Sequence, residues 1–216
     1  ASGVTMTTTA AIATANTING SGSVAITSLD ADLDANLAGV TASGGVTYAT
    51  TTISGTTKSF TGTLAAGVAT ITGTDTTGDI FNVDGATLGT ATFVVTNAIL
   101  QGTAAKLTGK TVTGNGNVEV SALNATLGAN LANLDNGSGA VSSAFSANGT
   151  FTGNLGTSSV AVASGVTMTT TAAIATANTI TGAGTLAVTA LNATANADLS
   201  NNTVTNHTAA VSDNVT

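Results

Sequence analysis

Short stretches in which apolar residues alternate with small or polar ones recur along the whole chain. Their centres lie at Ala25, Thr47, Thr70, Val94, Glu119, Val141, Ala161, Ala187 and Ala210. A period of two places alternate side chains on one face of an extended chain, so each stretch predicts a β-strand. The centres follow one another at roughly 23 residues, a separation that suits one turn of a β-solenoid.

One segment returns without any change. Residues 1–18 read ASGVTMTTTAAIATANTI, and residues 163–180 repeat the same letters. A looser repeat begins at Ile18, Val112 and Ile180, where an apolar residue precedes two Gly separated by one residue and then a Val/Ile/Leu pair at i and i+2. A copied segment belongs to an array in which each unit has the same physical role. The repeats therefore predict an architecture rather than a reaction.

These patterns predict an all-β chain, folded as a parallel β-solenoid of roughly nine turns with about 23 residues per turn. The alternative is a tandem β-sandwich, because nine short strands would also fit that fold. The chain has 26 Gly and no Pro, which suits strands joined by tight turns. Aromatics are only 3%, so we expect a core of small and β-branched side chains. Since composition shows no break, we expect residues 1–216 to be one repetitive segment and a window of a longer repeat protein.

The segment that follows each apolar pair has two interpretations. Residues 29–37 alternate between Leu or Ala and Asp or Asn, which predicts a half-buried strand. The Leu residues are also four positions apart, and Ser28 and Gly39 are suited to cap a short helix. Asp, Asn and Thr are poor helix formers, so strand or loop is favoured over helix.

Charge is scarce and mostly negative. Charged residues make up 6% of the chain, against about 25% in a typical soluble protein, and the net charge is −7. Phosphate binding needs Lys or Arg, so nucleic acid is not an expected partner, and anionic membrane surfaces are disfavoured for the same reason. No apolar run is long enough to cross a bilayer, so no membrane span is expected. Cys is absent, which excludes disulfides, thiol catalysis and thiolate metal sites.

The stretch VAVASGVTMTTTAAIATANTITGAGTLAV, residues 160–188, resembles the right-handed parallel β-helices of large bacterial surface proteins. Autotransporter passenger domains, filamentous adhesins and repetitive surface-layer proteins share its texture of Val-x-Val, Ser-Gly-Val-Thr-Met and Ile-Thr-Gly-x-Gly-x-Leu-x-Val. Partial copies at residues 111–120 and 18–26 extend the resemblance over most of the chain. The resemblance implies an extracellular or cell-surface location, and it brings no catalytic residues.

Asp30, Asp32 and Asp34 are the candidate metal ligands. If their segment is a strand, the three carboxylates share one face, and a hard cation such as calcium would relieve their repulsion. The spacing is similar to the start of an EF-hand loop, but Ala35 and Thr41 stand where that loop needs Gly and Glu. The other copies carry Asn, Thr or Gly at most of these positions. A solvated polar face is therefore the competing interpretation, and no cofactor other than calcium is expected.

Other polar residues have a structural interpretation. Asp75, Asp79 and Asp84 form a second acidic patch, which matches no calcium-repeat motif. His207 is the only His and has no evident catalytic partner, so a surface or turn position is expected. The Gly-x-Gly pairs recur with the repeat and are interpreted as turn or close-approach glycines. These pairs begin at Gly20, Gly114 and Gly182.

Three runs of Thr occupy residues 7–9, 50–52 and 169–171. If these runs stacked on one another, they would form flat ladders that could order water and bind ice or a crystalline polysaccharide. The competing interpretation is that Thr favours strands and stays soluble on an outer face.

Taken together, these features favour a structural role: a segment of an extracellular fibre, adhesin stalk or surface layer that acts through stacking and self-association. Unpaired strand edges would template the next unit or chain, so the expected partner is the chain itself, with surface glycans as a further candidate. The competing class is a binding module that uses a Thr-rich or Asp-rich face for glycan, ice or calcium. An enzyme is not expected, because Arg, Cys and a paired His are absent.

Overall fold

The computed structural model describes residues 1–134, 137, 139–191 and 196–211. The chain is mostly β, with 45% in strands and 10% in helices, and its sheets are parallel. The predicted all-β class is thereby confirmed. The chain forms two compact units. Unit 1 comprises Ala1–Gly102 and Lys110–Val118 with Gly137 and Gly139, and unit 2 comprises Thr103–Gly109 with the described parts of Glu119–Asp135 and Ala140–Thr216.

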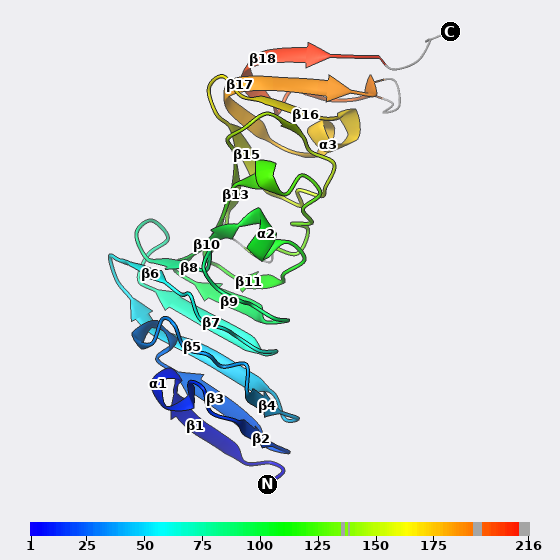
Figure 1. Cartoon of the computed structure of the whole chain (residues 1–216). Helices are drawn as coiled ribbons and strands as arrows, with labels where there is room; N and C mark the ends of the chain where they lie inside the picture. The colour runs from blue at the N-terminus through cyan, green and yellow to red at the C-terminus, as the bar shows by residue number, and fades with distance from the viewer. Residues whose placement is uncertain (135–136, 138, 192–195, 212–216) are drawn as a thin grey trace. The chain divides into compact units, whose positions relative to one another are not determined.

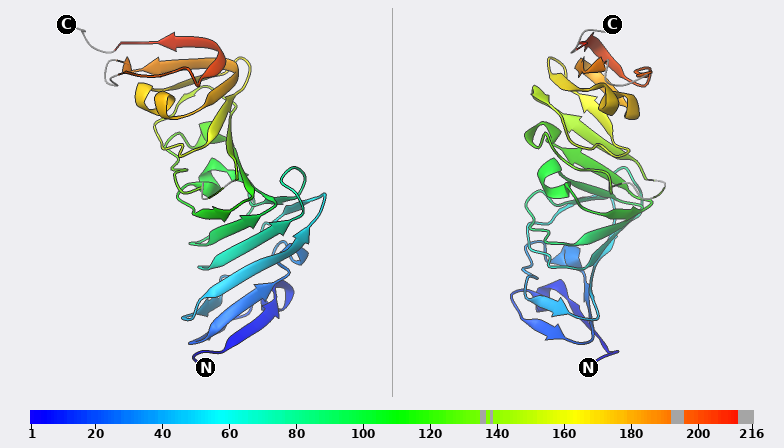
Figure 2. Two further views of the ribbon diagram at one scale, coloured as in Figure 1. Left: turned by 180° about the vertical axis from the view of Figure 1, so that it is seen from behind. Right: turned by 90° about the vertical axis from the view of Figure 1, so that its right-hand side faces the viewer.

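In unit 1 the main sheet takes one strand from each successive coil, where a coil is the stretch from one strand of this sheet to the next (Figure 1; Figure 2, left). Its strands, in order, are β1 (Thr5–Thr9), β3 (Ser23–Thr27), β5 (Val46–Ile53), β7 (Val68–Gly73), β9 (Thr92–Thr96) and β11 (Val112–Gly114). Neighbouring strands are parallel, so that Val24 lies opposite Val46 and Thr70 opposite Val94. The register shifts once, between Ala49 and Thr52 in the pairing of β5 with β7. Val, Ile and Thr dominate these strands because branched side chains pack well on a pleated surface.

Consecutive coils of unit 1 also pair outside the main sheet. One further ladder consists of β6 (Thr57–Ser59), β8 (Ile80–Asn82) and β10 (Ile99–Thr103), and another of β2 (Ile18–Gly20) and β4 (Val40–Ala42). Isolated bridges join Asn36 to Thr63 and Thr63 to Thr87. Each coil is therefore hydrogen-bonded to the next at several points along its length.

Unit 2 is built in the same way. Its strands are β13 (Val141–Phe145), β14 (Gly149–Thr150), β15 (Ser159–Val162), β16 (Thr167–Thr171), β17 (Ile180–Thr189) and β18 (Thr203–Ala209), while β12 (Asn117–Ser121) has residues in both units. The long strand β17 pairs with β15 through its first residues and with β16 through its later ones. On its other side β17 pairs with β18, which follows it along nearly its whole length.

The spacing between paired residues is not constant. It is 17 residues between Ser142 and Ser159 and 24 residues between Val68 and Thr92. The predicted repeat of about 23 residues falls in this range but is not kept from coil to coil. Parallel pairing fixes only the strand positions, so the turns between strands can differ in length.

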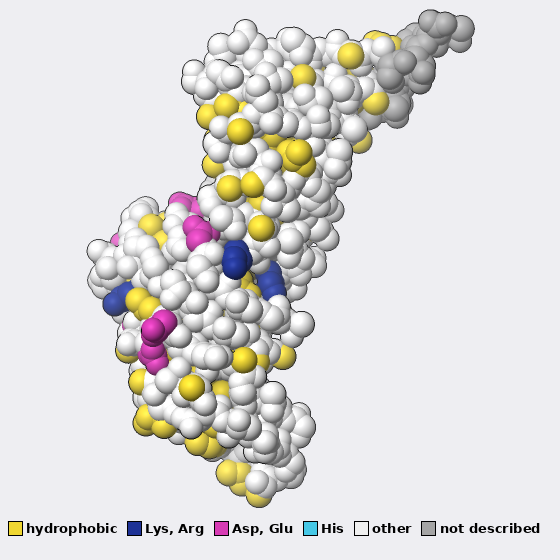
Figure 3. Space-filling view, viewed as in Figure 1, with side chains coloured by type: hydrophobic (Ala, Val, Ile, Leu, Met, Phe, Trp, Pro, Cys, Tyr) yellow, Lys and Arg dark blue, Asp and Glu magenta, His cyan; other side chains and the backbone are white. Residues whose placement is uncertain are grey.

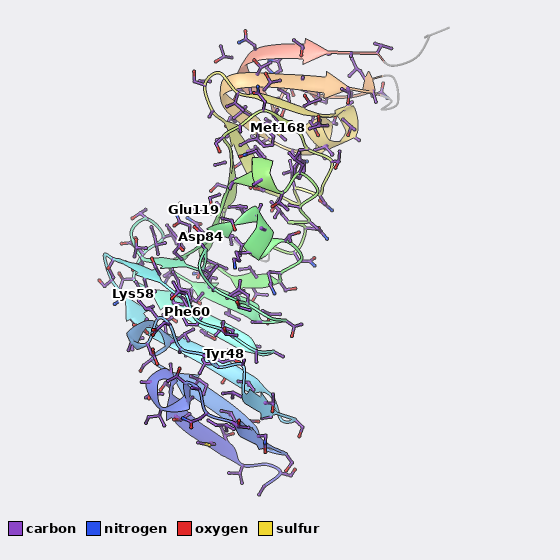
Figure 4. All side chains as sticks on the ribbon, in the orientation of Figure 1. Tyr48, Lys58, Phe60, Asp84, Glu119 and Met168 are labelled. Carbon is purple, nitrogen blue, oxygen red and sulfur yellow. The ribbon has the colours of Figure 1, made fainter. Side chains whose placement is uncertain are left out.

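The core contains every aromatic side chain of the chain. The rings of Phe60 and Phe81 stack with centroids 5.9 Å apart, and Tyr48 is fully buried in the same unit (Figure 4). The remaining buried aromatics are Phe93, Phe145 and Phe151. The expected small and β-branched side chains make up much of the core, and Leu and the few aromatic side chains pack among them.

Short helices and turns form the corners. The one-turn helices are α1 (Ala10–Ala13), α2 (Ala104–Leu107) and α3 (Ala172–Ala177). The hydroxyls of Thr9 and Thr171, in the two identical segments, accept the N–H of Ile12 and Ile174 and cap α1 and α3. The identical segments thus fold into the same sequence of strand, helix and strand.

The Leu/Ala segment contains no strand: residues 29–31 form a short helix, and residues 32–37 are turn and loop apart from an isolated bridge at Asn36. Of the favoured interpretation of strand or loop, the strand is therefore wrong and the loop is confirmed for residues 32–37. Leu29–Ala31 and Leu123–Ala125 form the 3-10 helices η1 and η2, and each follows a residue with left-handed backbone, Ser28 (φ 55°) or Ala122 (φ 51°). This turn directs both leading Leu side chains inward, where they are fully buried. The alternation of apolar and polar residues therefore reflects which side chains of a turn point inward. The third copy, at residues 192–195, lies outside the described residues.

A second corner recurs in most coils and was not anticipated. A Leu carbonyl accepts the backbone N–H three residues later, which closes a tight turn. The Leu residues are Leu37, Leu88, Leu131, Leu155 and Leu199. The residue before several of them stiffens the turn, since the Oδ1 atoms of Asn36, Asn130 and Asn154 accept the N–H two residues later.

Two of the repeated Gly-x-Gly pairs confirm the close-approach interpretation. Gly114 and Gly182 have φ values of +107° and +117°. A Cβ atom at these positions would lie 2.1 Å from the carbonyl oxygen of Val95 and 2.3 Å from that of Val162. Neighbouring coils can therefore approach this closely only where the side chain is absent.

Candidate functional site

Asp30, the first predicted metal ligand, binds the next coil. It lies in η1 and only 8% of its surface is exposed. Its Oδ1 atom accepts the backbone N–H of Thr51 at 2.5 Å, and its Oδ2 atom accepts the Thr51 hydroxyl at 2.6 Å. Hydrogen bonds to an ionised acceptor are strong, so both carboxylate oxygens help to hold η1 against β5.

The second copy makes the same contact with a neutral side chain. Asn124 lies in η2, and its Oδ1 atom accepts the N–H of Ser146 at 3.2 Å and the Ser146 hydroxyl at 3.0 Å. The position therefore requires an oxygen acceptor rather than a negative charge. Asn192, its equivalent in the third copy, lies outside the described residues.

Asp32 and Asp34 interact with each other. Burial raises the pKa of the Asp32 carboxyl, and a hydrogen bond with Asp34 and the negative charge of Asp34 raise it further. The described residues contain no group of three or more His, Cys, Asp or Glu side chains that could hold a metal ion. A calcium site at Asp30, Asp32 and Asp34 stays a prediction, in which Asp30 would have to share its oxygens with Thr51.

Asp79, in the second acidic patch, is a buried anchor. Its side chain is fully buried. The Oδ2 atom accepts three hydrogen bonds: from the N–H of Thr74 at 2.5 Å, from the Thr74 hydroxyl at 2.7 Å and from the N–H of Asp75 at 3.0 Å. The Oδ1 atom accepts the N–H of Gly55. The hydrogen bond from the Thr74 hydroxyl is the main reason that the pKa of Asp79 falls to about 2. Burial alone would raise this pKa, but the backbone N–H donors lower it further and outweigh that effect. One ionised side chain thus organises the 74–79 loop and ties it to the preceding coil.

The other two acids of this patch have separate roles. Asp75 closes its own turn, because its Oδ1 atom accepts the N–H of Thr77 and Gly78 at 2.7 Å and 2.9 Å. These hydrogen bonds lower the pKa of Asp75. Asp84 is exposed and accepts a hydrogen bond from the Asn82 amide at 3.3 Å. The patch is therefore an anchor, a turn and a surface carboxylate rather than one binding site.

The role of Asp79 was not predicted from the sequence. The available signal was the order Thr74, Asp75, Gly78 and Asp79. Asp followed by Thr-Thr-Gly is typical of a turn closed by its own side chain. A second Asp directly after such a turn is placed to accept the N–H groups that the turn leaves unpaired.

The three Thr runs do not stack on one another. In β1 and β16 the runs pair with β3 and β17, neither of which carries a Thr run. In these two runs the middle residue, Thr8 or Thr170, is buried. In the third run the hydroxyl of Thr51 donates a hydrogen bond to Asp30. The prediction of stacked, flat Thr ladders is therefore wrong for these runs.

The outer face of the main sheet in unit 1 is uncharged. Its six strands contain no Asp, Glu, Lys or Arg. One row across this face consists of Ala49, Thr70, Val94 and Thr113. Charged side chains also occupy only small patches of the surface shown in Figure 3. Such a face presents methyl and hydroxyl groups, which can pack closely against an equally uncharged surface.

His207 lies on β18, where it is exposed and stands opposite Leu186. The expected surface position is thereby confirmed. Among the described residues, no helix combines the length and the apolar character that a membrane crossing requires. The chain matches no protein-family model, and the comparisons with curated proteins and with solved structures gave no significant match.

Proposed function

We propose that this chain is a structural segment of an extracellular fibre, adhesin stalk or surface layer, and that its coils form a β-solenoid. The observation that carries the proposal is the parallel pairing of successive coils in both units. In this arrangement the backbone groups of one coil are satisfied by its neighbours, so stability grows by repetition and needs no disulfide. The resemblance to bacterial surface β-helices supplies the extracellular location.

Self-association is the second part of the proposal. The strands of the main sheet in unit 1 carry no charge, and the whole chain has only 6% charged residues. Close approach of copies therefore meets little electrostatic repulsion or desolvation of ions. The role is mechanical and interfacial, and no catalytic role is assigned to any residue.

Sedimentation velocity over a wide concentration range, with electron microscopy of the same samples, tests this function. We expect larger species to grow with concentration. Aligned fibres should give a meridional reflection at about 4.8 Å, the spacing of stacked strands. Monomers at every concentration would contradict self-association, and fibres without that reflection would contradict the solenoid. A chain that stays monomeric but binds an insoluble polysaccharide would favour the alternative, a glycan-binding module.

A further inference from the structure

Side chains on the outer face of the main sheet in unit 1 are aligned in rows that cross several coils. Side chains alternate between the two faces of a strand, and paired residues of neighbouring strands continue each outward row into the next coil. Figure 2 (left) shows these strands following one another in a single sheet. We call the outward residues of these pairs the outer rows, and none of them is buried. They are Thr7, Ala25, Thr47, Val68 and Thr92 in the first row, Ala49, Thr70, Val94 and Thr113 in the second, and Thr52, Thr72 and Thr96 in the third.

The outer rows contain only Thr, Ala and Val, and Thr is the most frequent of the three. They do not depend on the consecutive Thr runs, because a strand contributes alternate residues to them, such as Thr70 and Thr72 of β7. The charged side chains of unit 1 all lie outside the six strands of this sheet. They are Asp30, Asp32, Asp34, Lys58, Asp75, Asp79, Asp84 and Lys110. The face therefore presents uncharged methyl and hydroxyl groups at regular intervals.

Hydrogen bonds within the sheet hold some of these hydroxyls in place. The Thr113 hydroxyl donates to the Phe93 carbonyl of the preceding coil at 3.2 Å, and at the end of β3 the Thr27 hydroxyl donates in the same way to the Thr8 carbonyl at 3.3 Å. A hydroxyl has one proton to donate, so each of these oxygens is left to accept hydrogen bonds from outside. Thr is also stiff about χ1. The face is therefore organised before a ligand binds, which lowers the entropic cost of binding.

The chemistry of this face restricts its ligand. A charged ligand finds no countercharge in the six strands. Sugar rings bind flat surfaces mainly by stacking on aromatic side chains, and every aromatic side chain of this chain is buried. The ligand that fits is uncharged, donates O–H groups and repeats at the spacing of the rows. Outward side chains repeat at about 4.8 Å between coils and at about 6.6 Å along a strand, which is two residues. Oxygen atoms on the prism face of hexagonal ice repeat at similar distances in two perpendicular directions.

We infer that the outer rows bind the surface of ice. Water beside the methyl groups of Thr, Ala and Val has restricted orientations. The Thr oxygens accept O–H groups from this water at positions set by the strand spacing, so the water layer joins the crystal lattice. A single hydrogen bond of this kind has a small net value, so binding requires rows that extend over several coils. This activity goes beyond the proposed structural role and requires no contact between copies.

Two Lys variants test this face. Thr47→Lys places a charge and a long side chain in the middle of the first row, where Thr47 lies between Ala25 and Val68. Thr57→Lys is the matched control, because Thr57 is an exposed strand residue of β6, in another ladder of the same unit. Far-ultraviolet circular dichroism and thermal unfolding check that both variants are folded. Thermal hysteresis, the gap between the melting and freezing temperatures of a seeded sample, and partition into slowly grown ice measure binding.

We expect the unmodified chain and Thr57→Lys to show thermal hysteresis and to enter the ice, whereas Thr47→Lys loses most of both. Equal activity of the two Lys variants would overturn the assignment to this face. An unmodified chain that stays in the liquid, or that binds crystalline cellulose or chitin but not ice, would overturn ice binding. Sedimentation velocity of the same samples separates this inference from the proposed function. Association without hysteresis would leave only the proposed function standing, and hysteresis from a chain that stays monomeric would leave only ice binding.

Discussion

Met6 and Met168 occupy the same position in two identical segments, yet Met6 is 47% exposed and Met168 is fully buried (Figure 4 labels Met168). Their own strands and the strands that follow them are equivalent, since Met6 lies opposite Val24 and Met168 opposite Leu186. The difference is the coil on the other side, which places Gly149 against Met168. Burial at this position is therefore a property of the stack and not of the local sequence.

Adding that coil in front of the chain should bury Met6. A chain that carries residues 141–162 directly before Ala1 reproduces the junction between Val162 and Ala163, because the next eighteen residues are identical. We expect oxidation of Met6 by peroxide to slow to the rate of Met168, since exposure controls access to the thioether. Digestion at the Lys residues separates the two Met residues for mass spectrometry. Unchanged Met6 oxidation would show that the edge of β1 does not accept this coil.

Asp79 should make stability depend on acid. The pKa of Asp79 is about 2, below the ordinary 3.8. At a pH above 3.8 the ionised carboxylate therefore stabilises the fold fully, and this contribution is lost as the pH falls toward 2. Urea unfolding between pH 5 and pH 2 should show a falling midpoint in the unmodified chain. Asp79→Asn should lower the midpoint at pH 5 and flatten its decline. Asp84→Asn, at the exposed acid of the same patch, is the control and should leave the midpoint and its decline unchanged. Equal pH profiles for Asp79→Asn and the unmodified chain would refute the stabilising role of Asp79.

At Asp30 the acceptor oxygen should matter more than the charge. Asp30→Asn keeps an oxygen for Thr51, as Asn124 does for Ser146, and should cost less than about 1 kcal/mol. Asp30→Ala leaves the N–H and hydroxyl of Thr51 without this acceptor and should cost about 1–3 kcal/mol. Equilibrium unfolding in urea measures both. Equal losses for the two variants would mean that the charge itself is required, which would favour the calcium interpretation.

The buried hydroxyls of Ser143 and Ser158 should be energetically coupled. Their Oγ atoms are 2.6 Å apart, and the residues are 4% and 1% exposed. Each single change to Ala removes this hydrogen bond from a buried hydroxyl and should cost about 1–2 kcal/mol, although Ser158 keeps a longer bond to the Ser159 carbonyl at 3.4 Å. The double change should cost less than the sum of the two. A double-mutant cycle in urea measures the coupling, with the exposed Ser142→Ala as control. Strictly additive losses would show that the two hydroxyls act independently.

Much of the strand pattern could be predicted from the order of residues. Alternation around Ala25, Thr47 and Thr70 falls within β3, β5 and β7, and the repeated Gly114 and Gly182 lie where coils approach closely. These features depend on the two-residue period of strands and on the lack of a Cβ, both of which act locally. The same local rule failed at residues 29–31, where a left-handed Ser28 turns the chain into a 3-10 helix although the apolar residues still alternate.

The candidate site could be predicted only in part, because the partners of its acids come from other coils. Asp30 looked like one of three equivalent carboxylates, but Thr51 lies 21 residues further along the chain. Asp79 looked like one member of an acidic patch, but the N–H of Gly55 reaches it from 24 residues earlier. No local spacing encodes these contacts, since they depend on the lengths of the intervening turns.

The sequence by itself determined that this protein is a repetitive, weakly charged β-chain, because side-chain period, Gly positions and composition act residue by residue. Only the tertiary structure decided which coil lies against which, and hence which side chains are buried. Thr8 and Thr170 turn inward, and Met6 and Met168 differ although their surroundings in sequence are the same. The physical reason is that the backbone groups and side chains of a strand in a parallel ladder are paired and covered by strands about twenty residues away in sequence. The sequence of one segment alone does not specify which strands these are.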